Sequence, residues 1–434
     1  GIPKVMPDGT VIAPTGTITS YLLTGADPSL INWNTTGPIF PTANPSLNQC
    51  SYDLPCTIFG VDQHLKTPYV LNWNLNLQQA LTSSSVLQVA YVANHGVKLY
   101  STVDINQVNP AVDDGYEQLG RPLVQNCPAS DNGSGLGGPC YPYLSFLNYL
   151  GNKSTSTYNA LQVTYTKRYS HGFYLLAGYT YGHAIDTTSG TTNLASVPQN
   201  SLDFAAEKAR GDYDIRHRFT LSLTYDLPSI KSKLQMLEGW ELTTIFTAQT
   251  GEPINIYDDG DDLTLTGEGA YNDGWDRWNI KGDPKKLKWS SSSTIPFLSP
   301  DDPTCLSVAT TPELLDALNY AEGCYAQKGV ILYPNAFGTF GNMGRNIFQG
   351  PGFVNWDMSV LKNWNLNEKL KLQFRGEVFN VLNHPNFANG SIGNDLYDPT
   401  SFGQAAATPD VQAANPVVGS GGSRHIQLGL KLIW

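Results

Sequence analysis

The chain has 434 residues and a formal net charge of −11, which argues against a surface that binds nucleic acid through its phosphates. Only 15% of its residues are charged, whereas about 25% are charged in a typical soluble domain. No run of 18 apolar residues occurs, so helical membrane spans are excluded, although strands that alternate in polarity could still cross a membrane. Aromatic residues reach 11% and glycine occurs 41 times, a composition that favours β-strands joined by irregular loops.

The first part of the chain, residues 1–66, is rich in Pro, Gly, Asn and Thr and predicts an irregular segment. Regular alternation of apolar and polar residues begins at Tyr69 and recurs to the end of the chain. A period of two residues predicts strands with one apolar and one polar face. We predict strands at residues 69–81, 87–100, 161–166, 173–181, 219–225, 240–250, 354–360, 370–378 and 426–434.

The predicted connections between these strands alternate between short turns and long loops. Turns of about four residues follow the first strand and the third, and another lies near residue 366. The long loops span about 101–154, 186–211, 251–350 and 384–423, and within the third of them residues 311–320 could form a short helix. A compact soluble fold rarely contains several loops of this length. A bacterial outer-membrane barrel has this pattern, with short turns on the periplasmic side and long loops outside.

The last strand ends with the last residue of the sequence. Its apolar face consists of Ile426, Leu428, Leu430, Leu432 and Trp434. An aromatic residue at the end of a strand is typical of the aromatic girdle at a membrane interface. The closing strand of a soluble β-sandwich would alternate in the same way. The loop pattern favours the membrane, and its parity would place Trp434 at the periplasmic interface.

The six cysteines lie close together in three pairs outside the alternating segments: Cys50 and Cys56, Cys127 and Cys140, and Cys305 and Cys324. None has the two-residue spacing or the nearby histidine that is typical of a zinc site. We therefore predict three local disulfides in loops, which form in an oxidising compartment.

The fold class predicted from these observations is all-β, an antiparallel transmembrane β-barrel. The chain supplies about nine or ten strands, which makes the barrel partial, with residues 67–434 forming its wall and residues 1–66 lying outside the cell. The predicted location is the outer membrane, where lipid contacts the wall.

Several segments resemble the C-terminal barrel of TonB-dependent outer-membrane receptors, especially the Oar-like group. They are residues 91–96, residues 211–219 (Gly-Asp-Tyr-Asp-Ile-Arg-His-Arg-Phe), residues 341–346 (Gly-Asn-Met-Gly-Arg-Asn), residues 372–387 and the ending at 426–434. The motif around Phe379 is the most specific of them. The resemblance touches most strands from Tyr69 onward, whereas the large loops match no family that we can name.

The resemblance implies an energised transporter that binds an external ligand through its loops. Such receptors have about twenty-two strands and a plug that fills the lumen, through which the inner-membrane TonB complex drives uptake. No plug is recognisable before Tyr69, so we expect this sequence to be the C-terminal portion of a longer receptor. A passive pore or an adhesin-type surface barrel is the alternative, and a secreted β-sandwich binding protein is the second alternative.

Two clusters in the 251–350 loop are candidate sites. The carboxylates of Asp258, Asp259, Asp261 and Asp262 could hold Ca²⁺, or they could simply be solvated. Tyr271, Trp275 and Trp278 could contact a sugar or peptide ligand, or they could pack within the loop. No nucleophile elbow and no zinc-protease motif occurs, so we expect neither an enzyme nor a cofactor.

Overall fold

The computed structural model describes residues 4–5, 11–12, 55–109, 119–131, 133–189, 197–268, 276–412 and 421–434. The chain divides into two compact units, Gly1–Cys56 and Thr57–Trp434. In the first unit, β1 (Lys4–Val5) pairs with β2 (Val11–Ile12) in antiparallel fashion. All further elements belong to the second unit, apart from the first residue of β3.

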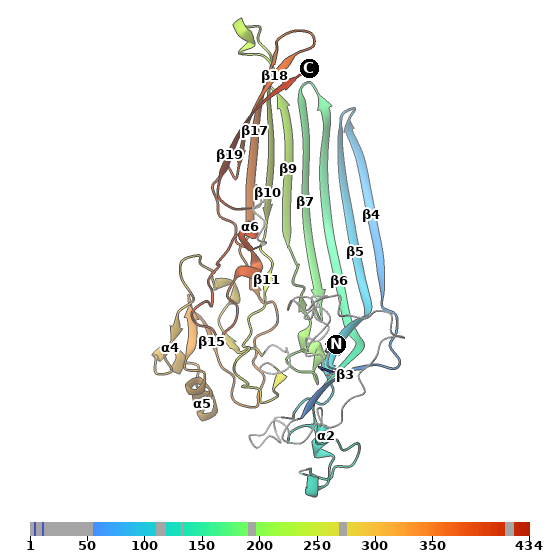
Figure 1. The fold of residues 1–434 in the computed structure, drawn as a ribbon, viewed down its shortest axis with the longest axis vertical. Helices are drawn as coiled ribbons and strands as arrows, with labels where there is room; N and C mark the ends of the chain where they lie inside the picture. The colour runs from blue at the N-terminus through green and yellow to red at the C-terminus, as the bar shows by residue number, and fades with distance from the viewer. Residues whose placement is uncertain are drawn as a thin grey trace. The chain divides into compact units, whose positions relative to one another are not determined.

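The second unit is built on one antiparallel sheet, whose long strands lie side by side in the order of the sequence (Figure 1). These strands are β4 (Tyr69–Thr82), β5 (Ser85–Asp104), β6 (Leu144–Ser170), β7 (Phe173–Asp186), β9 (His217–Asp226), β10 (Trp240–Gln249), β17 (Phe353–Asn365), β18 (Lys371–Phe379) and β19 (His425–Ile433). The short strand β3 (Cys56–Val61) adds to β6, and β8 (Ala209–Arg210) adds to β7. Within the described residues, β4 and β19 form the two edges of this sheet.

The register between the strands brings the predicted apolar faces onto one side of the sheet. Residues that are directly paired across strands share a face. One such row, on the face that we call outward, consists of Leu77, Val89, Val163, Tyr179, Phe219, Ala248 and Val354. The neighbouring row, on the inward face, consists of Gln78, Gln88, Thr164, Gly178, Thr220, Thr247 and Asn355. The wall therefore has an apolar outward face and a polar inward face, as an outer-membrane barrel requires.

The same register fixes the tilt of the strands. Successive pairs lead from Ser85, the first residue of β5, across six strands to Ile426 on β19. The last residue of β19, Ile433, is seven positions further (433 − 426), and seven steps separate the two strands. The strand ends thus advance about one residue, or about 3.4 Å, for each step of about 4.8 Å. This corresponds to a tilt of about 35°, which is within the range of transmembrane barrels.

The connections separate by length to the two ends of the sheet (Figure 1). At the short-turn end, Ser83 and Ser84 link β4 to β5, and His171 and Gly172 link β6 to β7. His171 and Gly172 have φ angles of 53° and 76°, as a tight two-residue hairpin turn requires. The connections 227–239 and 366–370 lie at the same end. The long connections 105–143, 187–216, 250–352 and 380–424 lie at the other, which we call the loop end.

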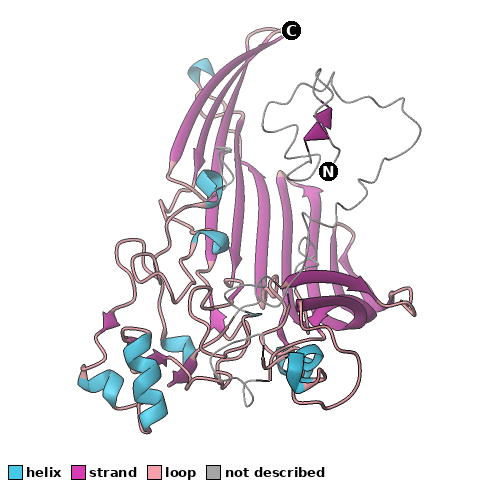
Figure 2. Cartoon of the chain, turned by 60° about the horizontal axis from the view of Figure 1, so that its bottom comes forward, coloured by secondary structure: helices cyan, strands magenta, loops and turns pink. Residues whose placement is uncertain are grey.

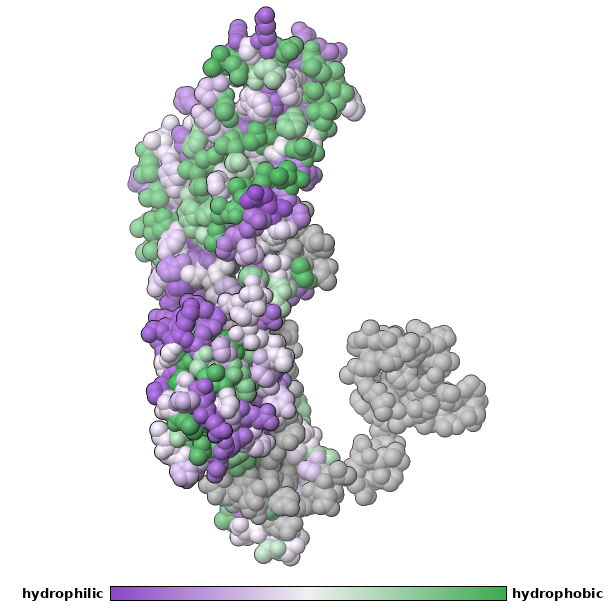
Figure 3. All heavy atoms as spheres, turned by 90° about the vertical axis from the view of Figure 1, so that its left-hand side faces the viewer, coloured by the Kyte–Doolittle hydropathy of each residue, from purple (hydrophilic) through white to green (hydrophobic). Residues whose placement is uncertain are grey.

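Aromatic side chains gather on the outward face near the short-turn end. Phe173 is paired with Tyr225, and their rings stack edge to face at 6.1 Å. Trp240 and Trp364 share this face on β10 and β17, and Trp434 follows the last residue of β19 with 90% of its surface exposed. Figure 3 shows that hydrophobic residues cover the strands on the side of β19, whereas hydrophilic residues gather at both ends.

Two of the predicted loops are shorter or more ordered than the sequence indicated. The loop predicted at 101–154 spans only 105–143, because β5 continues to Asp104 and β6 begins at Leu144. These extensions pair through their backbones, and some of their side chains pack inside the protein, as Phe146 and Leu150 do. No lipid-facing alternation is needed there, so the pattern did not reveal them.

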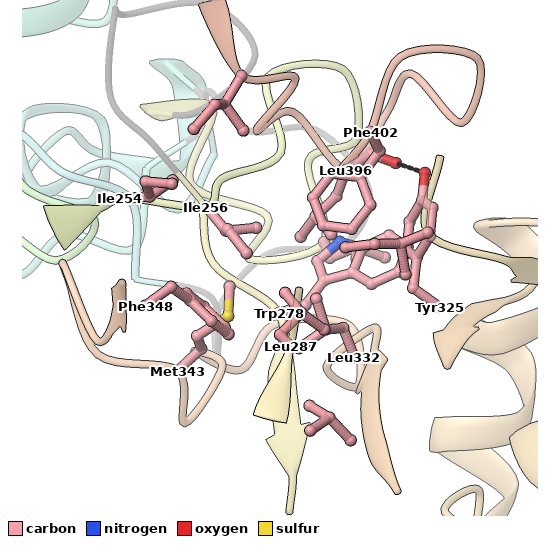
Figure 4. Packing of buried hydrophobic residues seen from close by; sticks show 14 of the residues in the cluster. Ile254, Ile256, Trp278, Leu287, Tyr325, Leu332, Met343, Phe348, Leu396 and Phe402 are labelled. Carbon is pink, nitrogen blue, oxygen red and sulfur yellow. Dashed lines mark hydrogen bonds between the residues drawn. The ribbon is translucent and has the colours of Figure 1, made fainter. Parts of the chain in front are cut away.

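The segment 251–350 was predicted to be irregular except for one helix, and this prediction was wrong. It contains β11 (Pro253–Ile254), β12 (Asn279–Lys281), β13 (Phe297–Leu298), β14 (Cys324–Gln327), β15 (Val330–Tyr333), β16 (Phe348–Gln349), α4 (Pro303–Leu306) and α5 (Pro312–Tyr320). Strands β12, β15, β14 and β13 form a small antiparallel sheet, and β11 pairs with β16. Its core includes Trp278 and Tyr325 and is shared with Phe402 of the β18–β19 connection (Figure 4). The Tyr325 hydroxyl donates to the carbonyl of Leu396 in that connection at 2.7 Å.

The helix expected at 311–320 is present as α5. The Thr311 hydroxyl accepts a hydrogen bond from the Leu314 N–H, and Pro312 occupies the first turn, where no N–H is needed. Figure 2 shows the helices of this segment, in cyan at the lower left, beside short magenta strands. The remaining helical turns are α2 (Pro122–Gln125), α6 (Pro409–Gln412), η3 (Ala129–Asp131), η4 (Phe204–Glu207), η5 (Lys233–Gln235), η6 (Pro284–Lys286) and η7 (Asn389–Ser391). Among the described residues, no helix has the length and apolar character to span a membrane.

Two of the three expected disulfides lie within the described residues. Cys127 is joined to Cys140 with a Cα–Cα distance of 4.8 Å, and Cys305 is joined to Cys324 at 5.7 Å. Both close loops at the loop end of the sheet. Cys50, the expected partner of Cys56, lies outside the described residues.

The face assignment predicts the effect of a charge in the middle of the wall. Leu221 lies on the outward face of β9, five residues from its end, and Leu221→Arg should lower the free energy of unfolding by about 2–4 kcal/mol. Ser222→Arg is the matched control, because Ser222 lies on the inward face and the same charge should cost much less there. Denaturant unfolding in lipid vesicles measures both variants, and equal losses would contradict the assignment.

Candidate functional site at the loop end

Two of the segments that carry the family resemblance meet at the loop end. The Asn346 amide donates hydrogen bonds to the carbonyl of Arg210 at 2.8 Å and to Asp212 Oδ1 at 2.7 Å. Asn346 has a φ of 57°, a left-handed conformation that asparagine tolerates better than most residues. A side chain at Gly341 would place its Cβ 1.9 Å from the carbonyl oxygen of Arg277, so only glycine allows this approach.

Arg345 is the centre of this junction. Its side chain is almost fully buried and donates to Ser189 Oγ at 2.9 Å, to the Glu207 carbonyl at 3.2 Å and to the Asp186 carbonyl at 3.1 Å. It also forms an ion pair with the Asp186 carboxylate and lies 3.5 Å from Asp212 Oδ1. The planar guanidinium has five donors and can satisfy several acceptors at once. Arg345 thereby joins the end of β7, the β7–β9 connection and the β10–β17 connection.

A second buried arginine supports the same junction. Arg277 binds both carboxylate oxygens of Glu207, at 3.1 and 2.6 Å, and donates to the Met343 carbonyl at 3.0 Å. A two-pronged contact of this kind is the strongest form of ion pair and fixes the orientation of both side chains. Glu207 therefore lies between two arginines, with Arg345 Nε 4.0 Å from its Oε2.

Asp214 connects the segment 211–219 to strand β7 of the wall. Burial alone would raise the pKa of Asp214, but hydrogen bonds from the Ala184 N–H and the Arg210 guanidinium outweigh burial and lower it. Those contacts measure 2.8 and 2.9 Å. The carboxylate therefore stays ionised and holds Arg210, which also donates to Gln349 at 3.0 Å.

A small pocket adjoins the junction. Polar residues line most of it, with the two arginines beside two acids: Thr102, Thr187, Ser189, Gln199, Glu207, Asp212, Arg277 and Arg345. Both arginines are already bound to carboxylates, so the pocket offers hydrogen-bonding groups rather than a strong net charge.

The motif around Phe379 closes the last long connection. The Asn380 amide donates to the carbonyls of His384 and Gly422, at 3.0 and 2.7 Å. Asn386 exchanges two hydrogen bonds with the backbone of Val354, at 2.7 and 3.0 Å. The asparagines of this motif therefore anchor the β18–β19 connection to β17, which gives them a structural role.

The predicted calcium ligands do not gather around one point. Asp258 is fully buried and accepts hydrogen bonds from the N–H groups of Gly260 and Asp261 and from Trp278 Nε1, at 3.1, 3.0 and 2.6 Å. Asp259 is exposed. Within the described ranges, no three His, Cys, Asp or Glu residues are placed to hold a metal ion. Calcium binding by Asp258, Asp259, Asp261 and Asp262 remains a prediction.

The predicted aromatic patch is only partly described. Tyr271 and Trp275 lie outside the described residues. Trp278 is buried, and its ring packs against Tyr325 at 6.0 Å (Figure 4). Trp278 thus belongs to the core of the 251–350 segment and offers no surface to a ligand.

Sequence reasoning did not assign roles to Arg277, Arg345 and Glu207. Arg345 lies in a segment that carried the resemblance, but a lone arginine gives no sign of its partners. Arg277 stands between Asp276 and Trp278, and a charged residue among aromatic residues in a loop could have indicated a buried ion pair.

Comparisons with known proteins agree with this architecture. Residues 10–427 match the family described as outer membrane beta-barrel domain. The chain belongs to this family. Its location is accordingly the outer membrane, and its wall is that of an outer-membrane β-barrel. No curated protein matches the chain.

Solved structures resemble the chain at low identity. The outer membrane transporter YddB from Escherichia coli is 11% identical with a TM-score of 0.38, over 87% of this chain and 34% of that one. BauA, the ferric preacinetobactin receptor from Acinetobacter baumannii, is 8% identical with a TM-score of 0.36, over 84% of this chain and 29% of that one. The ferric enterobactin receptor PfeA from Pseudomonas aeruginosa is 10% identical with a TM-score of 0.37, over 85% and 31%. This chain therefore covers about a third of the length of these proteins.

The junction predicts that Arg345→Met strongly destabilises the loop end. Removing one partner of a buried ion pair typically costs about 3–5 kcal/mol, and here the Asp186 carboxylate would stay buried without its arginine. Arg375→Met is the matched control, since Arg375 is half exposed and lies 3.6 Å from Glu377, a pair worth at most about 1 kcal/mol. Limited proteolysis of the folded protein should cleave the loop end faster in the first variant only. Equal cleavage in both would contradict the proposed role.

Asp276 predicts a pH dependence of the loop end. Burial, followed by the nearby carboxylate of Asp262, raises the pKa of Asp276 to about 8. The protonated form therefore favours folding, and this contribution is lost as pH rises from about 4, the unfolded value, to about 8. Asp276→Asn should remove this loss, so its advantage over the native protein should grow by up to about 1.4 kcal/mol per pH unit. Thermal unfolding at pH 5 and 8 measures it, with Asp301→Asn, an exposed acid, as control.

Proposed function

We propose that this protein is the barrel portion of a TonB-dependent receptor of the Oar-like group, which captures an external ligand at the loop end. The observation that carries the proposal is the junction around Arg345. Buried ion pairs hold two of the long connections, β7–β9 and β10–β17, in one fixed arrangement at one end of the wall. A passive pore does not need buried ion pairs between its loops, because these loops need not present a surface of defined shape.

The orientation follows from the lengths of the connections. In outer-membrane barrels the short turns face the periplasm and the long loops face outside. The loop end would then meet the ligand first. The ligand surface would include the exposed side chains beside the junction, such as Tyr213, together with Tyr271 and Trp275.

Transport would follow capture. The polar inward face of the wall would line part of a lumen through which a hydrophilic ligand can pass once a plug moves aside. In this proposal the TonB complex of the inner membrane supplies the energy through that plug, as the family resemblance implies. The protein itself contributes no chemistry to the ligand.

Two measurements on the whole protein, reconstituted in lipid, test the proposal. In a planar bilayer, a receptor with a plugged lumen should show no steady ion conductance. In nanodiscs, it should bind the purified periplasmic domain of TonB, whereas the same domain should not bind an unrelated porin used as control. A steady open conductance without TonB binding would overturn the proposal and identify a passive pore.

A further inference from the structure

The β9–β10 connection differs from the other connections at the short-turn end. The neighbouring links comprise two to five residues, whereas this one spans residues 227–239. It also exposes a series of apolar side chains, with Leu234 84% and Ile230 64% exposed, and Leu227, Met236 and Leu237 about half exposed. A contiguous apolar surface of this kind normally marks a contact with a membrane or a protein.

The connection has a fixed conformation against the wall. Gln235 exchanges two hydrogen bonds of 2.9 Å with the backbone of Asn365, the last residue of β17. Trp240 Nε1 donates to the Met236 carbonyl at 2.8 Å, and the Ile230 N–H donates to the Leu237 carbonyl at 3.2 Å. These hydrogen bonds fix the backbone of the connection, which leaves its apolar side chains exposed in a defined arrangement.

This surface continues the lipid-facing side of the sheet. Lys362 is paired with Trp240 and Phe374 on the outward face, and its ammonium group donates to the Glu238 carbonyl of the connection. The same group lies 4.7 Å from the ring centre of Trp364 and 5.8 Å from that of Trp240. The connection thus contacts the outward face at the aromatic girdle, where the wall leaves the hydrocarbon.

The charges on the connection match a lipid surface. Lys231 and Lys233 are exposed and lie between Ile230 and Leu234 in the sequence. The one acid within the connection, Glu238, is turned back to accept the Ser232 N–H at 3.0 Å. Apolar side chains beside exposed lysines are typical of segments that lie in the plane of a membrane interface and are attracted to anionic lipids.

We propose that residues 227–239 form an interfacial anchor in the phospholipid leaflet at the short-turn rim. Ile230, Leu234 and Leu237 enter the boundary between headgroups and acyl chains, and Lys231 and Lys233 bind lipid phosphates. The anchor would fix the height of the barrel in the membrane and hold the adjoining edge of the sheet against it. Continuity with the outward face and the two lysines favour lipid over a protein partner.

A fluorescent label at Leu234→Cys tests the depth of the anchor in the whole protein. In nanodiscs that contain phosphatidylglycerol, a lipid with a nitroxide near its headgroup should quench the label, and aqueous iodide should not. The control label at Leu202→Cys replaces a side chain that is 71% exposed at the loop end, and iodide should quench it. If the Leu234 label behaves like the control, the anchor does not exist.

The lysines are tested by Lys231→Gln with Lys233→Gln in the labelled protein. A lysine near an anionic surface contributes about fivefold to a binding constant, so the double change should raise the iodide-accessible population by up to about 25-fold. Lys285→Gln with Lys286→Gln, an exposed pair at the loop end, is the matched control and should change nothing. If iodide quenching of the label at position 234 is unchanged after both lysines are replaced, the proposed contact between these lysines and lipid phosphates is wrong.

Native outer-membrane vesicles distinguish lipid from a protein partner. The lipid anchor predicts the same quenching there as in nanodiscs. If the label is shielded from both quenchers in native vesicles but open to iodide in nanodiscs, a protein covers the connection and the proposal is overturned.

Discussion

The architecture depends on the need to satisfy every backbone N–H and C=O group in a medium that offers no water. In hydrocarbon, each unsatisfied group costs several kcal/mol, so membrane strands must pair with neighbours along their whole length. Pairing from strand to strand carries one register from β5 to β19, apart from shifts at residues 96–101 and 167–170, and that register keeps one face apolar and the other polar. The apolar outward face, the polar inward face and the tilt of the strands thus follow from the need to pair every backbone group.

The sequence predicted those parts of the fold that this requirement controls. All nine long strands, their faces and the alternation of short and long connections could be predicted, because lipid on one side and water on the other impose a period of two. The part of β6 that precedes Leu161 and the ordered structure of the 251–350 segment could not be predicted. Neither Leu144 nor Trp278 meets lipid, and a protein core such as that around Tyr325 leaves no simple period in the sequence.

The candidate site was even less visible in the sequence than the fold was. Arg345, Glu207 and Arg277 are far apart along the chain, and they are joined by contacts that form only after two connections, β7–β9 and β10–β17, have folded together. The motifs around Gly341 and Asn380 were recognisable, but the hydrogen bonds of Asn346, Asn380 and Asn386 show that these residues hold loops in place. Where the wall leaves the membrane, such side-chain hydrogen bonds, rather than contact with lipid, determine the conformation of the chain.

The direct pairing of β10 with β17 has a consequence for how such proteins can diversify. About a hundred residues separate these strands in the sequence, yet they pair as closely as neighbours joined by a tight hairpin. The entropy lost on closing a loop rises only slowly with its length, so a long excursion adds little cost once the strands are paired. The excursion has a disulfide and packs a core that it shares with the β18–β19 connection, so its parts away from that core and from Arg345 can lengthen or shrink without altering the paired strands. The loop end and the membrane-spanning wall can then vary separately within one chain.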